Sequence, residues 1–340
     1  MDLPEKIQDL PPNWARFCLE VERFVSKDLK VDIKNKSLLL AVSGGPDSVA
    51  LLITFKVLAP RINSSVFVAH LNHGIRKEAK EEAEFVKDLC NKLKVPFFGG
   101  RTNAVLFSNR KKIGLEEGAR ILRYRFLYGV LKKKGADFIL LAHHLNDLAE
   151  DILLRIIRGT FWPNMGGMTG FDEKRKILRP FLLTPKKVLK DFLKDLNIPW
   201  IEDPSNWDLR YKRNRIRHKI LPLLEKENPN FLNVIKRIWI LSQLDLNHWK
   251  TEIQKLKSRE VIDKGCIKIK KSDLKDLSEA LRLRWYIDIL KRISKGEIIT
   301  ENLLDLDRAV KENRSDKTFQ FPSNRVAYLE KEYLIFYKKE

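Results

Sequence analysis

Short, almost wholly apolar runs alternate with longer amphipathic segments from about residue 37 to about residue 196. Apolar residues recur at spacings of three and four in the longer segments, which is the period of an α-helix. The short runs lack a polar face, as expected of strands that are covered on both sides. This alternation predicts a doubly wound α/β fold with a mainly parallel sheet. The expected strands are residues 37–42, 65–70, 95–99 and 138–142, and the expected helices are residues 47–58, 78–93, 116–134, 146–158 and 184–196.

The later part of the chain has a different pattern. A basic helical segment is expected at residues 209–224, and from residue 229 the period is mainly helical, with an interruption near residues 264–270. Alternation returns at residues 318–321 and 325–336, which predicts a hairpin or short sheet. We therefore expect an α/β domain over residues 1–224 and a smaller, mostly helical region over residues 225–340 that ends in a short β element.

Charge and composition narrow the class of protein. Lys and Arg number 66 against 45 Asp and Glu, so the net charge is +21, while 44% hydrophobic residues exclude a disordered chain. Such an excess of positive charge favours a polyanionic partner, and nucleic acid is favoured over an anionic membrane. The three cysteines lie far apart and form no Cys-x-x-Cys pair. With no signal peptide and no long apolar run, we expect a soluble, cytoplasmic protein without membrane partners.

A glycine-containing turn joins the first expected strand to the first expected helix. Glycines let backbone N–H groups approach phosphate oxygens, and a helix N-terminus adds partial positive charge. The turn matches neither the Walker loop nor the Gly-x-Gly-x-x-Gly fingerprint. Asp47 would repel phosphate unless a cation such as Mg²⁺ lies between them. We interpret the turn as a phosphate cradle rather than a generic serine-capped turn; its residues are Ser43, Gly44, Gly45, Pro46, Asp47 and Ser48.

Histidines and acids gather at the end of the fourth expected strand. His143 and His144 end the strand, and Asp147 and Glu150 follow at a spacing of three on one face of the next helix. Two carboxylates that face a cleft suit an ammonium group or a bound cation. The alternative is an ordinary helix start, where acids are favoured by the dipole. A metallohydrolase that also uses His70 and His73 is disfavoured, because adjacent strand residues point to opposite faces.

Two further groups of basic residues have candidate roles. Arg123 suits a bidentate contact with phosphate, whereas pairing with Glu116 or Glu117 explains Arg120 equally well. Six basic residues and no acid lie between Arg210 and Lys219. This second group suits contact with a curved phosphate backbone, the alternative being a solvated helix face.

Taken together, the motifs resemble those of the PP-loop ATP pyrophosphatases and, within that group, of the tRNA(Ile)-lysidine synthetases. The resemblance keeps the order of the motifs from residue 43 to residue 217 and is weak beyond residue 224. Besides Ser43 to Ser48 it rests on His70 to Arg76, Glu116 to Tyr124, Ala142 to Glu150, Arg158-Gly159-Thr160, Arg179-Pro180, Asp203 to Asn206 and Arg213 to Arg217.

The resemblance implies a fold like that of the adenine nucleotide alpha hydrolases and a ligase activity. Members of the family join L-lysine to carbon 2 of the wobble cytidine in an isoleucine tRNA with the anticodon CAU. They use ATP and Mg²⁺ and release AMP and pyrophosphate through an adenylated cytidine. No protein partner is implied beyond a homodimer.

Roles for individual residues follow from the same resemblance. Residues 43–48 and His70 would bind ATP, Asp47 would hold Mg²⁺, and Asp147 and Glu150 would bind lysine. The catalytic residues would be Asp47, Arg123, His143, Asp147 and Glu150, and contacts with tRNA would come from Arg158, Lys212, Arg213, Arg215 and Arg217.

One departure and two rival functions stay open at this point. Phe161-Trp162-Pro163 stand where the family has small residues, and these aromatic rings suit either stacking on a flipped base or a core plug. A PP-loop tRNA thiolase is disfavoured because the chain offers no Cys-x-x-Cys for a metal cluster. A non-catalytic basic RNA-binding protein would need neither residues 43–48 nor the two acids.

Overall fold

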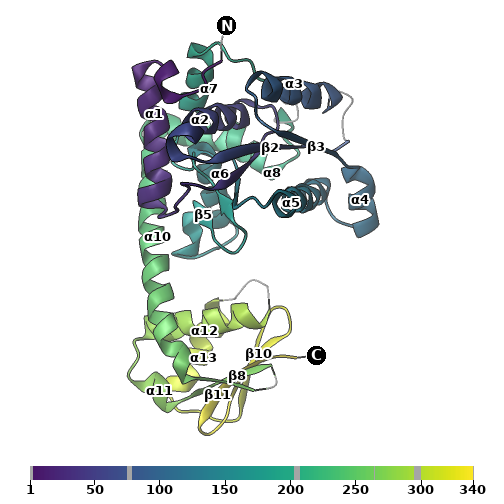
Figure 1. Cartoon of the computed structure of the whole chain (residues 1–340). Coiled ribbons are helices and arrows are strands. Elements are labelled where there is room, and N and C mark those ends of the chain that lie inside the picture. The colour runs from purple at the N-terminus through teal and green to yellow at the C-terminus, as the bar shows by residue number, and fades with distance from the viewer. Residues whose placement is uncertain (1–2, 75–78, 203–206, 264, 295–299, 340) are drawn as a thin grey trace. The chain divides into compact units, whose positions relative to one another are not determined.

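The computed structural model (Figure 1) describes residues 3–74, 79–202, 207–263, 265–294 and 300–339. The chain forms two compact units, residues 1–240 and 241–340. The division lies inside helix α10, Phe231–Leu256, whereas the sequence analysis places the boundary between residues 224 and 229.

The first unit contains a six-stranded sheet in the order β3-β2-β1-β4-β6-β5. All neighbouring pairs are parallel except β5 with β6, which confirms the predicted mainly parallel sheet. Strands β5 and β6 were not predicted, because two residues are too few to show a period. The strands are β1 Ser37–Ala41, β2 Ser65–Asn72, β3 Phe97–Arg101, β4 Phe138–Leu140, β5 Phe171–Asp172 and β6 Ile177–Leu178.

Helices cover both faces of this sheet, as the apolar strands require. Leu38 and Leu40 of β1 belong to the core that α1, α2 and α7 share, while Leu39 between them belongs to the core beneath α5. Figure 1 shows α2 and α5 on opposite sides of the strands. The helices are α1 Pro12–Arg23, α2 Pro46–Ile62, α3 Ala79–Lys92, α4 Ala104–Lys111, α5 Leu115–Lys134, α6 Leu145–Ile157 and α7 Lys186–Asp195.

The basic helical segment predicted at residues 209–224 is a helix with one wide turn. Helix α8, Lys212–Arg215, continues through a π-helical turn, η5 (Ile216–Ile220), into α9, Leu221–Glu227. Leu221 packs with Leu145 and Leu148 of α6 in a separate small core. Short helical turns elsewhere in this unit are η1 Ile7–Asp9, η2 Phe24–Asp28 and η3 Asn164–Gly166.

The second unit contains a five-stranded antiparallel sheet in the order β7-β8-β11-β10-β9. The terminal β element is therefore larger than the predicted hairpin, and the interruption near residues 264–270 is strand β8. A buried bidentate ion pair, Arg282 with Asp307, joins two of its helices. The elements are η6 Lys257–Arg259, β7 Glu260–Asp263, β8 Cys266–Lys270, α11 Ser272–Lys275, α12 Glu279–Ile293, α13 Thr300–Lys311, β9 Lys317–Phe321, β10 Arg325–Leu329 and β11 Tyr333–Lys338.

No helix among the described residues is both long and apolar enough to cross a membrane.

Candidate active site

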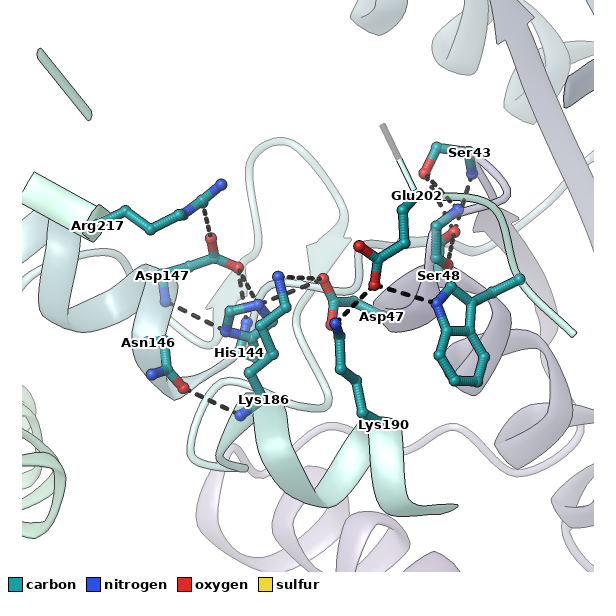
Figure 2. A network of polar contacts seen from close by, with 12 residues as sticks. Ser43, Asp47, Ser48, His144, Asn146, Asp147, Lys186, Lys190, Glu202 and Arg217 are labelled. Carbon is teal, nitrogen blue, oxygen red and sulfur yellow. Dashed lines mark hydrogen bonds and ion pairs between the residues drawn. The ribbon is translucent and has the colours of Figure 1, made fainter. Parts of the chain in front are cut away.

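The glycine-containing turn lies at the N-terminus of α2, as predicted. The Ser48 hydroxyl accepts hydrogen bonds from the backbone N–H groups of Ser43 (3.1 Å) and Gly44 (3.2 Å) and donates one to the Gly45 carbonyl (2.9 Å). Gly44 has a φ of +97°, a backbone conformation that favours glycine. One serine hydroxyl thus holds the turn in its tight form (Figure 2).

Asp47, in the first turn of α2, lies between two cationic or proton-donating groups. Its Oδ2 is 3.4 Å from His144 Nε2 and 3.8 Å from Lys186 Nζ. Its Oδ1 is buried and accepts no hydrogen bond within the described parts of the chain. Buried polar atoms are seldom left unpaired, so an unpaired carboxylate oxygen beside an anion-binding turn indicates a ligand site.

The residues present fit a magnesium ion in the way that nucleotide enzymes hold it. Mg²⁺ usually binds through one or two carboxylates and the substrate's phosphates rather than through a cage of protein ligands. Asp47 supplies such a carboxylate, and its side chain keeps 25% of its surface exposed. The described residues contain no cluster of three or more His, Cys, Asp or Glu that would hold a metal by themselves, so the metallohydrolase alternative gains no support.

His144 connects this turn to the acidic pair. It caps α6: its backbone N–H donates to Asp147 Oδ2 (3.1 Å), and its Nδ1 accepts from the Asp147 N–H (3.2 Å). Burial works to lower the pKa of His144, but Asp147 and Asp47 outweigh it and raise this pKa overall. A proton on Nδ1 would break the cap, so the ring proton belongs on Nε2, which faces Asp47.

Asp147 and Glu150 are both buried and are paired with arginines of the chain itself. Arg213 Nε donates to Glu150 Oε2 (2.6 Å), and one of its Nη groups donates to Asp147 Oδ1 (3.0 Å). Arg217 Nε donates to Glu150 Oε1 (2.6 Å), and its guanidinium lies 3.4 Å from Asp147 Oδ1. Burial alone would raise the pKa of Asp147, but His144 and Arg213 lower it well below its usual range. Asp147 is therefore ionised, and both acids are paired with guanidinium groups of the chain itself.

The five residues expected to contact tRNA separate into three groups. Arg213 and Arg217 point to the acids. Arg215 donates to the backbone carbonyls of Leu209 (2.9 Å) and Arg210 (2.7 Å) and so holds the preceding turn. The remaining two, Arg158 and Lys212, are exposed.

His143 is held by a residue that the sequence analysis did not assign. Arg179 Nε donates to His143 Nδ1 (3.1 Å) and its Nη1 donates to the Thr169 carbonyl (2.8 Å). Burial lowers the pKa of His143 to about 3, and a neutral ring is also what the Arg179 contact requires. The Arg179-Pro180 dipeptide was noted as a motif, but nothing in the sequence indicated its partner.

This lowered pKa predicts an acid-dependent stability. The unfolded chain protonates His143 near its ordinary pKa of about 6.5, whereas the folded protein does not until the pH approaches 3, so acid favours unfolding over that window. From pH 7 to pH 5 this residue should lower the free energy of unfolding by up to about 2 kcal/mol. Urea denaturation of wild type and His143→Gln at both pH values measures this difference, and an identical pH dependence would contradict it.

The other predicted histidine, His70, is buried, whereas the predicted arginine, Arg123, is exposed on α5. His70 Nδ1 contacts the Val42 carbonyl (2.9 Å), and burial lowers the pKa of His70. Burial and then Arg123 lower the pKa of His73 to about 4. Arg123 has no carboxylate at ion-pair distance among the residues that the structure describes. An arginine in this position is suited to an anionic ligand.

Lys186 is a site residue that the sequence analysis missed. It begins α7, and its backbone N–H donates to Asn146 Oδ1 (3.0 Å), which fixes its place beside α6. In Figure 2 its side chain reaches Asp47 next to the neighbouring ion pair of Lys190 with Glu202 (2.7 Å). A lysine in a lysine-rich amphipathic helix carries no motif, so no signal could single it out.

The residues of the aromatic segment after Arg158 differ in their exposure to solvent: Phe161 is 36% exposed, whereas Pro163 is buried. Two parts of the noted motifs, Arg76 and residues 203–206, lie outside the described residues.

Comparisons with known proteins identify the family of the chain. Residues 17–224 match the family model described as a PP-loop domain. A tRNA(Ile)-lysidine synthase of Nitratidesulfovibrio vulgaris is 36% identical over 89% of this chain and 92% of its own length. One of Petrotoga mobilis is 36% identical over 75% of this chain and 80% of its own length.

A solved structure shows the same fold at greater distance. The U34-tRNA thiolase NcsA from Methanococcus maripaludis, determined with its [4Fe-4S] cluster, is similar with a TM-score of 0.54 and 18% identity over 67% of this chain and 79% of that one. Matched over more than half its length by the PP-loop model and over nearly all of it by a curated relative, the chain belongs to the tRNA(Ile)-lysidine synthase family of PP-loop proteins.

Proposed function

We propose that the protein uses ATP to join L-lysine to carbon 2 of the wobble cytidine in an isoleucine tRNA with the anticodon CAU. The ligase forms an adenylated cytidine and releases pyrophosphate, after which lysine displaces AMP. The observation that carries this proposal is the chain of contacts from Asp47 through His144 to Asp147, because it joins a phosphate-binding turn to a buried acidic pair. Since tRNA and ATP are the substrates, we assign the reaction to the cytoplasm.

The phosphate side of the site is electropositive in spite of Asp47. The N-terminus of α2, Lys186 and Arg123 would face the negative charge that develops on the phosphates during adenylation. When bound at Asp47, Mg²⁺ would supply further charge neutralisation there. Without bound Mg²⁺, the ammonium group of Lys186 lies close to Asp47, so ATP does not meet an unpaired carboxylate in the turn.

Binding of the substrate lysine requires Asp147 and Glu150 to exchange one of their present hydrogen-bond partners. Asp147 and Glu150 have their oxygens engaged with Arg213, Arg217 and the His144 N–H. A lysine ammonium would replace one guanidinium at these oxygens, a like-for-like exchange of cations that keeps the buried acids neutralised. Attack requires the unprotonated amine, and the proton that the ammonium loses has to pass to a neighbouring group or to solvent; burial lowers the pKa of His143 to about 3, so this ring is a weak proton acceptor.

Contacts with the tRNA backbone would come from the exposed members of the predicted set. Replacing Lys212 or Arg158 by alanine should flatten the dependence of log Kd on log salt by roughly 0.7 to 0.9 for each lost phosphate contact. Lys133→Ala, at the exposed end of α5, is the matched control for loss of one positive charge. Equal flattening by the control would mean that the whole positive field, rather than these residues, attracts the RNA.

The reaction is tested by incubating protein, ATP and labelled lysine with an isoleucine tRNA that carries a cytidine at the wobble position. Label in the tRNA that depends on ATP, and its absence when the wobble base is uridine, is the expected result. A protein that binds the tRNA without transferring label would be the non-catalytic alternative.

The thiolase alternative is the less supported of the rival enzymes. Cys18 and Cys90 are buried, and burial raises the pKa of both thiols to about 12, which makes them poor nucleophiles and metal ligands. Cys266 lies in the second unit. The likeness to the solved thiolase concerns the fold alone.

A further inference from the structure

An exposed aromatic stack stands at the edge of the basic helical segment. The rings of Trp207 and His218 have centroids 4.4 Å apart and planes inclined by 21°. Trp207 is nonetheless 68% exposed, so the indole face that points away from His218 is open to solvent. The histidine fixes the orientation of the indole and thereby creates a flat, preorganised apolar surface.

The surroundings of this stack are cationic. Exposed Lys212 and Lys219 lie on the same helical segment, and exposed Arg210 pairs with Asp208 close by in the sequence (2.7 Å). His218 directly follows Arg217, whose guanidinium contacts Glu150 of the acidic pair. An aromatic surface on a cation-rich segment that also supplies an arginine to the acidic pair matches the chemistry of single-stranded RNA better than that of an apolar protein partner.

We propose that the Trp207–His218 stack binds one unpaired base of the tRNA anticodon loop, a neighbour of the wobble cytidine. This inference rests on the proposed function, because the wobble base itself has to enter the site between the phosphate turn and the acidic pair. When one base is extracted from the loop, its neighbours lose their stacking contact with it. An aromatic side chain can replace this contact by stacking on a neighbouring base. Every base has a π face, so this contact adds affinity without reading the sequence.

The experiment measures binding of an RNA stem–loop with the anticodon-loop sequence, labelled with 2-aminopurine at one loop position beside the wobble cytidine. Wild type should quench the 2-aminopurine fluorescence on binding. Trp207→Leu should weaken binding by about 5- to 100-fold and abolish the quenching, whereas Trp207→Phe, which retains an aromatic face, should remain within about threefold. Because stacking releases no counterions, the salt dependence of Trp207→Leu should equal that of wild type.

Lys212→Ala is the matched contrast, since it should flatten the salt dependence and leave the quenching intact. Urea denaturation of Trp207→Leu shows whether the variant remains folded, which its exposure leads us to expect. Equal affinities of the leucine and phenylalanine variants, or unquenched fluorescence in the wild-type complex, would overturn the proposal. Equal competition by a fully paired RNA duplex would overturn it as well.

Failure of this inference can be told apart from failure of the proposed function. If wild type transfers labelled lysine to tRNA and Trp207→Leu binds the stem–loop normally, only the proposed stacking contact is refuted. Wild type that quenches the labelled loop but never transfers lysine refutes only the ligase activity.

Discussion

Replacing Asp47 by asparagine is expected to reduce ATP-dependent pyrophosphate release by at least about 100-fold. The substitution keeps the shape of the side chain but removes the charge that faces Lys186 and His144 and that would hold Mg²⁺. Affinity for tRNA should stay within a few fold, because no contact with RNA is assigned to this residue. Pyrophosphate release and filter binding measure the two quantities on the same preparation.

Glu22→Gln is the matched control for loss of one acid next to α2. Glu22 pairs with Arg61 near the opposite end of that helix (2.8 Å), so its removal should leave pyrophosphate release within about twofold. Unchanged release by Asp47→Asn would refute the metal assignment. Parallel loss of release and of tRNA affinity would instead indicate that Asp47 maintains the fold.

Replacing Glu150 by glutamine should raise the Michaelis constant for lysine by about 10- to 100-fold. A charge-assisted hydrogen bond to an ammonium contributes roughly 1.5 to 3 kcal/mol, and the substitution removes the charge. Glu150 is also fully buried between Arg213 and Arg217, so these guanidiniums lose their shared partner. The free energy of unfolding should therefore fall by about 3 kcal/mol. Lysine titrations and urea denaturation measure the two effects.

Arg217→Met tests the exchange of cations at the same carboxylate. If lysine replaces a guanidinium there, removal of Arg217 takes away a competitor, and the Michaelis constant for lysine should fall several-fold while that of Glu150→Gln rises. Adenylation of tRNA without lysine should persist in both variants. A higher lysine constant in Arg217→Met would mean that this arginine helps to hold the amino acid instead of competing with it.

Periodicity and length decided which elements could be predicted from the sequence. Strands β1, β2 and β4 and helix α2 are largely apolar because they are largely buried, and this is visible in the sequence. Strands β5 and β6 have two residues each; β6 takes its conformation from pairing with β4, and β5 from pairing with β6. Strand β8 alternates Ile with Lys, which is the period of a strand, but its five residues are too few to show more than an interruption of the surrounding helical pattern.

The sequence predicts those features of the site that depend only on residue type and on position along the chain. Asp47, His144 and Asp147 meet because parallel strands bring their carboxyl ends to one edge of the sheet. A run of basic residues, however, does not reveal which of them point inward. Arg213 and Arg217 reach the buried acids through the rotation that α8 and its π-helical turn impose, and this orientation depends on packing beyond the motif.

The position of His144 has a thermodynamic consequence. One imidazole contacts Asp47, which we propose faces ATP, and accepts the hydrogen bond of the Asp147 N–H next to the proposed lysine site, so the proposed function implies that the free energies of binding of ATP and lysine are linked. Whatever factor ATP imposes on the dissociation constant of lysine, lysine must impose on that of ATP. We therefore expect each of the two proposed small substrates to change the affinity for the other at equilibrium, even in the absence of tRNA.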